Sequence, residues 1–335
     1  FPTRRSSDLA ITFLLLLGLA ALNMFYLFNR LDSFFDYMLF GFPVFKSGLT
    51  GYTNPDMIIA QRVMYTSLGL AFISITVLLF KRLPQSVNHR FLSMASAVLF
   101  TALTAGTAYY FLDRVYSERT MKRLVIDTNR KYEDANFLEI KDSGIEIEYY
   151  DGRIKATASL SCRNDSEKSI NTAAFSLNPG LAVRGVLINS GEANYEIDNH
   201  IINVHFDPPL DGGAATTIDF HYEGMINEAF CYPWHSEDIK EFSYNIGPVR
   251  IRRSQVIQKD DYLLLTPETH WYPVAGLNYY PSNPARISID FSNYSLKVSR
   301  ENGLRAVSQG SGSADNDYWY FTNETPLTGI SLAQG

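Results

Sequence analysis

Residues 91–112 read FLSMASAVLFTALTAGTAYYFL, which is 22 residues without a single Asp, Glu, Lys or Arg. Two further runs share this property, residues 9–28 (20 residues) and residues 63–80 (18 residues). About 20 apolar residues, at 1.5 Å each, form a helix that crosses the roughly 30 Å hydrocarbon layer of a membrane. A charge near the centre of such a helix costs about 2.5–3.5 kcal/mol, so charge-free runs are a strong signal. The sequence therefore predicts three transmembrane helices, at about 9–28, 63–80 and 91–112.

The third run is rich in Ala, Ser, Thr and Gly, and small residues let helices pack closely in lipid. A short connection at 81–90, containing Pro84, joins it to the second run, so these two runs are expected to form an antiparallel hairpin. We interpret residues 10–113 as a segment of membrane helices, and these features suit a multi-helix bundle better than a solitary anchor. The aromatic, glycine-interrupted stretch 31–62 is expected to form a short interfacial or re-entrant element, with a buried packing segment as the alternative.

Both ends of the chain suggest a fragment. Residues 1–9, FPTRRSSDL, resemble an in-frame translation of a sequencing adapter, and we interpret them as an artefact. Their two arginines would otherwise imitate the start of a secretory signal peptide. The chain stops abruptly at residues 331–335, SLAQG. We therefore expect the natural protein to continue on both sides.

The polar part after the third run, from about Arg114 to Gly335, is long enough for one or two water-facing domains. The mean hydropathy of the whole chain, −0.09, hides this division because it averages an apolar third with a polar remainder. The net charge of −6 and the isoelectric point near 5.6 argue against nucleic acid as a main partner.

The distribution of Lys and Arg near the predicted spans indicates on which side of the membrane the head lies. Residues 81–90 contain three cations, whereas residues 30–62 contain three in a stretch three times as long. This density favours a cytoplasmic hairpin turn and an extracytoplasmic head. Four cations within 114–123 argue the other way, although long domains can translocate despite such charge. The predicted location is thus the cell membrane, crossed several times, with the head outside the cytoplasm.

Residues 114–140 are interpreted as a polar, partly helical stalk, and a period of two begins after Gly144. Clear alternation of apolar and polar residues occurs at 145–149, 154–160, 202–206, 218–222, 287–291 and 296–298. Turn signals such as Asp151-Gly152 and Asn178-Pro179-Gly180 separate these runs. Alternation places one strand face on a core and the other in water. The fold class is therefore an α + β membrane protein, in which three transmembrane helices precede an antiparallel β-sandwich or saddle domain at 141–335.

Local motifs for catalysis are absent. There is no His-Glu-x-x-His, no phosphate-binding loop and no Gly-x-Ser-x-Gly elbow. His200 and His205 lie on a predicted strand at a spacing that puts them on opposite faces, which is poor geometry for a shared metal. Cys162 and Cys231 are interpreted as two buried free thiols, and a disulfide between them stays open if the head lies outside the cytoplasm.

Two aromatic segments, 232–235 (YPWH) and 270–273 (HWYP), allow two interpretations. They are either aromatic packing at loop corners, which we favour, or a binding edge. The segment 250–253 (RIRR) is interpreted as a solvated cationic edge strand rather than an anion site.

The order of motifs in the β portion resembles the N-terminal saddle domain of the aminopeptidase N family of zinc peptidases. The motifs are LNPGL at 177–181, PLDG at 209–212, HYEG at 221–224, WYP at 271–273, YSLKV at 294–298, AVSQG at 306–310, WYF at 319–321 and ISLA at 330–333. Each is weak alone because it consists of turn and core residues. The resemblance covers about residues 145–335. Helices before such a domain further resemble bacterial ABC-exporter permeases that carry an aminopeptidase-like head.

The resemblance implies that zinc, the His-Glu-x-x-His pair and the Glu that accompanies it belong to a following domain, which this sequence does not contain. The chain itself is therefore expected to bind no cofactor and to be inactive. Family members also hold the free amine of the substrate through a Gln-x-Glu segment. This chain has TPETHWY at 266–272 instead, so Glu268 is the candidate substrate-binding residue, and a plain turn acid is the alternative.

Two functions are consistent with these observations. The first is a fragment of an ABC-transporter permease and zinc aminopeptidase-like protein, with lipid, other transmembrane helices, an ABC ATPase and peptide as expected partners. The second is a membrane-anchored β-sandwich binding module without peptidase ancestry. A wide, curved sheet with the Trp271 loop at its edge would favour the first, whereas a compact sandwich with a sealed Trp271 corner would favour the second.

Overall fold

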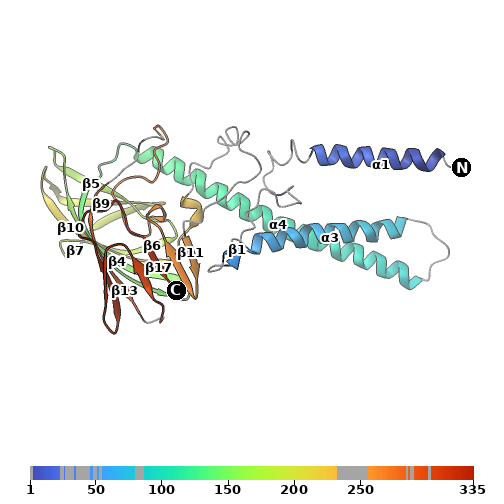
Figure 1. Ribbon diagram of the computed structural model, residues 1–335. Coiled ribbons are helices and arrows are strands. Elements are labelled where there is room, and N and C mark those ends of the chain that lie inside the picture. Colours follow the sequence, from blue (N-terminus) through green and yellow to red (C-terminus); the bar gives the residue numbers. More distant parts are fainter. Residues whose placement is uncertain are drawn as a thin grey trace. The chain divides into compact units, whose positions relative to one another are not determined.

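The computed structural model describes residues 3–22, 26, 34, 46–47, 51–52, 55–79, 87–231, 256–283, 286, 290–300 and 303–335. These residues form two compact units, one up to Glu118 and one from Arg119 onward. The first unit is mainly helical and the second consists mainly of strands in mostly antiparallel sheets, so the predicted α + β class is confirmed (Figure 1).

The first unit is mainly helical. Its elements are α1 (Thr3–Leu22), a hairpin of β1 (Lys46–Ser47) and β2 (Gly51–Tyr52), α3 (Pro55–Leu79), and the first part of α4 (Val87–Tyr132). Two helices are long and apolar enough to cross a membrane, Pro55–Leu79 and Arg90–Tyr132. The predicted span at 9–28 is not shown as a third, because the apolar helix described there covers only Leu9–Leu22 and most of 23–28 lies outside the described residues.

Helices α3 and α4 form the predicted antiparallel hairpin (Figure 1). Ser67 Oγ on α3 lies 2.9 Å from Thr104 Oγ1 on α4, and Ser96 on α4 donates to Ser74 Oγ on α3 over 3.0 Å. The residue numbers increase along α3 as those of its partners on α4 decrease, so the two helices run antiparallel. Only 17% and 6% of the most apolar windows of the two helices are buried inside the chain. This exposure suits helices solvated by lipid better than core helices of a soluble domain.

Most of the stretch 31–62, for which an interfacial element was predicted, lies outside the described residues. Within it, the carbonyl of Phe34 accepts a hydrogen bond of 2.6 Å from the Tyr65 hydroxyl. The ring of Phe34 also lies 6.0 Å from that of Phe111 on α4. These contacts hold one residue of the connection against the helical hairpin.

The second unit is built on a wide sheet of eight strands in the order β15-β16-β13-β3-β4-β10-β6-β7. Its strands are β3 (Glu139–Tyr150), β4 (Arg153–Arg163), β6 (Leu181–Ile188), β7 (Gly191–Glu192), β10 (Ala215–Gly224), β13 (Asn293–Ser299), β15 (Ser311–Ala314) and β16 (Tyr318–Thr322). Two smaller sheets share its hydrophobic core. They are β5-β9-β8 (Ile170–Ser176, Ile201–Leu210, Asn194–Asp198) and β11-β12-β17-β14 (Val256–Lys259, Tyr262–Leu265, Leu332–Gln334, Ala306–Ser308).

Alternation of burial confirms the predicted strands. In β3 the side chains of Ile145, Ile147 and Tyr149 are buried, whereas Glu146 and Glu148 between them reach solvent. The runs at 154–160, 202–206, 218–222 and 296–298 behave in the same way. The run predicted at 287–291 falls partly outside the described residues, because 287–289 are not among them.

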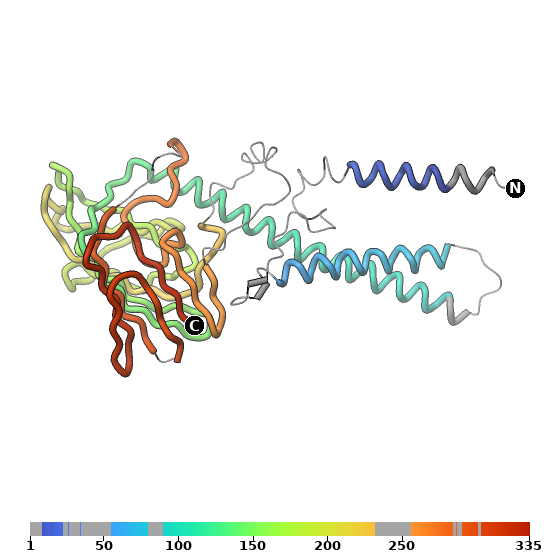
Figure 2. The backbone as a smooth tube through the Cα atoms, viewed as in Figure 1, coloured from blue at the N-terminus to red at the C-terminus, as the bar shows by residue number. Residues whose placement is uncertain are grey.

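One pairing corrects the expectation of a purely antiparallel domain. Strand β13 pairs with β3 in parallel, with Leu296 beside Ile145 and Val298 beside Ile147. The colours of the tube in Figure 2 show that the two strands are far apart along the chain, since β3 lies in its green part and β13 in its orange-red part. Parallel neighbours need a long crossover rather than a tight turn, and the chain between Tyr150 and Asn293 provides it. Period-two patterns predict strands but not their neighbours, so the alternation could not have shown this.

The last turns of α4 belong to the second unit. The side chains of Val125, Thr128 and Asn129 are buried there, although this part of the sequence was interpreted as a polar stalk. The helix ends at Tyr132 and strand β3 begins at Glu139. The polar stretch is thus helical as far as Tyr132, and one of its faces packs into the core.

Candidate functional site

The predicted substrate residue Glu268 lies on a short 3-10 turn, η5 (Pro267–Thr269), directly after β12. Pro267 opens the turn, and the Thr269 hydroxyl donates a hydrogen bond of 2.7 Å to the carbonyl of Thr266. His270 ends it in the left-handed conformation, with φ of 46°. The turn buries Thr269 and His270 and leaves the Glu268 side chain exposed to solvent.

Asn178, in the loop between β5 and β6, holds this turn in place through hydrogen bonds. Its backbone N–H donates to His270 O over 2.9 Å, and its side-chain amide donates to Thr269 O over 2.9 Å. Its Oδ1 accepts hydrogen bonds from Gly180 N at 3.0 Å and Asn227 N at 2.8 Å. A buried amide with this many partners holds its surroundings in one arrangement. The motif at 177–181 therefore meets the turn at 266–270, which leads directly into the motif at 271–273. We call this part of the fold the Glu268 corner (residues 177–181 and 266–273).

Beneath the Glu268 corner, Phe230 of η3 (Glu228–Cys231) lies between two buried histidines. Its ring centroid is 5.0 Å from that of His200 and 5.2 Å from that of His270. His270 Nδ1 lies 2.9 Å from Ser176 Oγ, and His200 Nε2 lies 2.7 Å from Asn129 Oδ1. Burial lowers the pKa of each imidazole from 6.5 to about 3, so both rings are neutral near neutral pH.

His200 and His205 are not brought together. His200 is buried just before β9, while His205 on that strand lies 2.9 Å through its Nδ1 from the Thr172 hydroxyl. No group of three or more His, Cys, Asp or Glu side chains in the described part of the chain could hold a metal ion. The zinc that the resemblance implies therefore finds no fitting ligand set among these residues, and no step through zinc is assigned to them.

The aromatic segment at 270–273 is packing rather than an open edge. Trp271 is 0% exposed, its indole N–H donates to Ile330 O over 3.2 Å, and its ring meets that of Tyr272 edge-on at 4.8 Å. The Tyr272 hydroxyl accepts a hydrogen bond of 3.1 Å from Ile330 N. The favoured interpretation as corner packing is confirmed here for residues 270–273. Whether this loop faces a following domain stays a prediction. Residues 232–235 and 250–253 lie outside the described residues.

Both cysteines, Cys162 and Cys231, are free and buried, as predicted. Burial raises the pKa of the Cys162 thiol to about 12, which keeps it protonated and unreactive. Glu268 itself forms no hydrogen bond or ion pair with any residue that the structure describes. Its carboxylate is available to an external cation, and its role stays a prediction.

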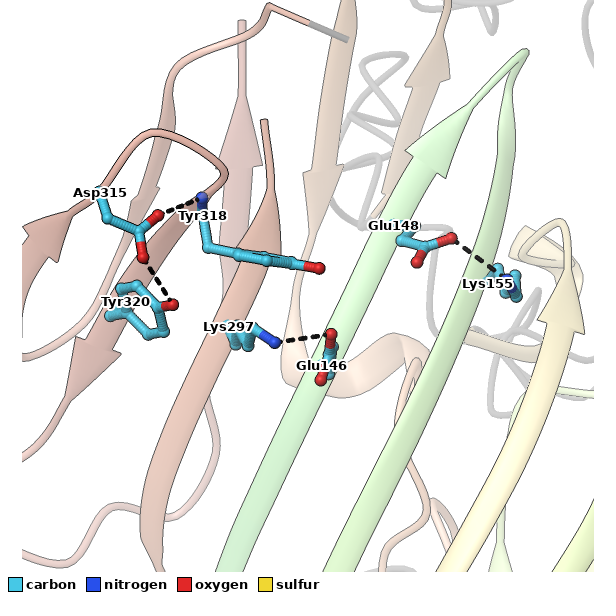
Figure 3. A network of polar contacts seen from close by, with 7 residues as sticks. All are labelled: Glu146, Glu148, Lys155, Lys297, Asp315, Tyr318 and Tyr320. Carbon is cyan, nitrogen blue, oxygen red and sulfur yellow. Dashed lines mark hydrogen bonds and ion pairs between the residues drawn. The ribbon is translucent and has the colours of Figure 1, made fainter. Parts of the chain in front are cut away.

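A second polar region, which the sequence did not single out, covers the solvent face of the eight-stranded sheet (Figure 3). Lys297 donates to Glu146 on the neighbouring strand over 2.9 Å, and its ammonium lies 3.8 Å from the centre of the Tyr318 ring. Asp315 accepts hydrogen bonds from the Tyr318 N–H at 2.7 Å and the Tyr320 hydroxyl at 2.9 Å. These pairs are exposed, so each contributes about 0–1 kcal/mol to stability.

No protein-family profile matches the chain, and no curated protein matches it either. Solved structures with a similar arrangement include a two-domain M1 zinc metallopeptidase bound to L-arginine, at 13% identity and a TM-score of 0.43. The M1 zinc metallopeptidase from Deinococcus radiodurans has 12% identity and a TM-score of 0.42. In both cases the match covers 58% of this chain and 42% of the other. Native yeast LTA4 hydrolase has 11% identity and a TM-score of 0.40, with 61% and 29% covered. This chain thus spans less than half the length of these M1 metallopeptidases.

Proposed function

We propose that this chain is the membrane-anchored part of an aminopeptidase N-like protein, and that its β unit shapes the side of a peptide site that receives the amino terminus. The convergence of two resembling motifs on the Glu268 corner carries this proposal. Asn178 and Thr269 are 91 residues apart in sequence, yet the Asn178 amide joins them over 2.9 Å. The corner offers one exposed carboxylate on a turn whose other residues are fixed.

The chemistry of that carboxylate suits a peptide ammonium group. Hydrogen bonds to charged groups contribute about 1.5–3 kcal/mol when the partner is held in place. Glu268 has no competing cation among the described residues, and the buried Thr269 and His270 beside it restrict the turn. The role proposed for Glu268 is therefore to orient the amino end of a peptide. Cleavage of the peptide would require the zinc and the base of another domain.

The membrane part of the proposal is supported by two long, exposed apolar helices. We propose that they insert in the cell membrane beside further helices of the same protein, and that the β unit lies outside the cytoplasm. A permease-like role with an ABC ATPase as partner belongs to this proposal and rests on the resemblance of the helical segment alone.

A second candidate is a membrane-anchored β module that binds a partner without peptidase ancestry. A compact sandwich with a sealed Trp271 corner was expected of such a module. The buried Trp271 fits that expectation, whereas the sheet of eight strands fits the first candidate. The two candidates differ in the coding sequence expected downstream of Gly335. Sequencing the genomic locus in frame past Gly335 separates them. The first requires a His-Glu-x-x-His with a Glu about 18–20 residues further on, the spacing implied by the family resemblance. A stop codon or another β repeat would contradict it.

A binding experiment tests the proposed role of Glu268 directly. The full chain in detergent is titrated into a C-terminally labelled alanine tetrapeptide, either with a free amino terminus or acetylated, and anisotropy is recorded. We expect binding of the free form only, weakened about tenfold by Glu268→Gln. Glu196→Gln, at an exposed acid on β8, is the matched control. Equal binding of the free and acetylated peptides would remove the proposed role from Glu268.

A further inference from the structure

A cavity lies beside Trp319 on β16 of the eight-stranded sheet, and none of its lining residues belongs to the Glu268 corner. Its volume is about 290 Å³, and Arg300, Gly303, Leu304, Arg305, Asn316 and Trp319 line it. This volume is close to the lower end of the range for small-molecule sites, about 300–1,000 Å³. The cavity therefore has room for a small molecule rather than a folded partner.

The lining is rich in donors and poor in acceptors. The six lining residues include two arginines, an asparagine and a tryptophan, and none of the six is acidic. The side chain of Arg305 is exposed and has no hydrogen bond or ion pair with any described residue. Its backbone is fixed, because Arg305 N and O each form a hydrogen bond of 3.1 Å with Gly335. The Arg305 guanidinium is thus without a partner among the described residues, and the backbone that carries it is held in place.

The second cation is held over an aromatic wall. The Arg300 guanidinium lies 4.8 Å from the centre of the Trp319 ring, and one of its nitrogens donates to the backbone carbonyl of Asp315. A guanidinium has five N–H donors, so these contacts leave several for a ligand. The Trp319 indole N–H is shielded from solvent and has no acceptor among the described residues, which adds to the excess of donors.

The carboxylate of Asp315 does not neutralise this excess by a hydrogen bond. Asp315 uses Oδ1 to accept from Asp317 N at 2.9 Å and Tyr318 N at 2.7 Å, and uses Oδ2 to accept from the Tyr320 hydroxyl at 2.9 Å (Figure 3). Both oxygens therefore turn toward their own loop and the solvent face of the sheet. An oxyanion from solution would meet two guanidinium groups without a competing acid among the lining residues.

We propose that this cavity binds a small oxyanion, a carboxylate or a phosphate group, between the side chains of Arg300 and Arg305. Guanidinium forks match the planar carboxylate and the phosphate oxygens, because two parallel N–H donors can meet two acceptor oxygens. Trp319 forms the apolar wall of the site. The proposal is independent of the proposed peptidase ancestry and of Glu268.

Fluorine NMR of the full chain in detergent tests this site. The chain has three tryptophans, so labelling with 5-fluorotryptophan gives three signals, and Trp319→Phe identifies the one from Trp319. Inorganic phosphate and acetate are titrated separately at constant ionic strength. We expect a saturable shift of the Trp319 signal, and the more effective of the two anions identifies the chemical class.

Arg305→Gln is expected to weaken the affinity by at least about tenfold, because it removes a charged donor. Arg184→Gln is the matched control, since Arg184 is an exposed arginine on β6 that pairs with Glu223 over 2.7 Å. It should leave the titration unchanged. Thermal unfolding of both variants establishes that each is folded. A Trp319 signal that does not saturate with either anion, or that responds equally in Arg305→Gln, would overturn the proposal.

Discussion

His200 Nε2 lies 2.7 Å from Asn129 Oδ1, and this contact joins the last turns of α4 to the start of β9 inside the second unit. The Asn129 amide nitrogen donates to Asn278 Oδ1 over 3.0 Å and to Tyr279 O over 2.7 Å. The oxygen must therefore be the acceptor for His200, which assigns the proton of the neutral ring to Nε2. Asn199, which lies 3.1 Å from His200 Nδ1, can then donate to the other nitrogen.

Asn129→Ala should destabilise the second unit by about 2–3 kcal/mol, because it leaves a buried imidazole N–H and two partly buried acceptors without their partner. Urea unfolding followed by tryptophan fluorescence measures the change. Asp127→Ala is the control on the same helix. Its ion pair with Arg130 is exposed at both side chains, so the change should stay within about 0.5 kcal/mol. Equal effects of the two variants would mean that the buried contact does not stabilise the unit.

Stability should fall as the pH falls below 6.5, because the two buried histidines have a pKa near 3 in the folded chain. Unfolded histidines take up protons from about pH 6.5 downward. Their contribution is therefore complete above that pH and is lost between about pH 6.5 and 3, at up to about 1.4 kcal/mol per pH unit for each ring.

His270→Asn separates this effect from that of the carboxylates. The shorter amide can still reach Ser176, but it does not titrate. The difference in unfolding free energy between pH 6 and pH 4 should be smaller in this variant than in the parent, by up to about 2.7 kcal/mol. An unchanged pH dependence would show that His270 titrates normally in the folded chain.

Gly180→Ala should destabilise the Glu268 corner. A Cβ at Gly180 would lie 2.0 Å from Met225 O and 2.8 Å from Asn227 N, both of them backbone atoms. Such overpacking typically costs about 1–3 kcal/mol. Gly185→Ala on β6 is the control, because a Cβ there would meet only the His221 ring at 3.9 Å. Denaturant midpoints of the two variants check this, and a loss at Gly185 as large as that at Gly180 would contradict the assignment.

Leu99→Arg should impair membrane insertion of α4. Leu99 is exposed and lies near the middle of the charge-free run, where an arginine costs about 2.5–3.5 kcal/mol. Leu124→Arg, at an exposed leucine in the polar part of the same helix, should have little effect. Insertion into microsomes, scored by glycosylation of an engineered acceptor site, measures both. Normal insertion of Leu99→Arg would argue that α4 does not cross a membrane.

The orientation of the β unit can be tested with a single new thiol. Cys162 and Cys231 are buried, so neither should react in the folded chain. Tyr150 is 51% exposed at the end of β3, and Tyr150→Cys provides an accessible reporter. A membrane-impermeant maleimide added to intact cells should label this variant if the β unit lies outside the cytoplasm. Labelling only after lysis would place the unit inside.

The sequence predicted those features that depend on which residues lie near each other along the chain. The strands at 145–149 and 218–222 were predictable because one face of each is buried and the other is exposed to solvent, which gives alternating apolar and polar residues. The Asn178-Pro179-Gly180 turn was predictable because its residue types favour turns. The helical hairpin was predictable from two apolar runs and a short connection.

The rest depends on contacts between distant residues, which no local pattern encodes. Asn129 meets Asn278 149 residues away, and nothing in the polar stretch around it distinguishes it from its exposed neighbours. The indole of Trp271 donates to Ile330 O, 59 residues further along the chain. The cavity beside Trp319 is lined by Arg300 and Arg305, which follow β13 rather than the strand that carries Trp319. Glu268 was found by resemblance, and the structure shows only that it is exposed.

The parallel pairing of β3 and β13 has a consequence for synthesis on the ribosome. Lys297 and its partner Glu146 are 151 residues apart, so one edge of β3 stays unpaired until that length of chain has emerged. At about 5–20 residues per second, translation of this interval takes roughly 8–30 s. An open strand edge is an aggregation hazard during that time. Nascent chains halted before residue 293 should therefore depend on chaperones, whereas those halted after it should not.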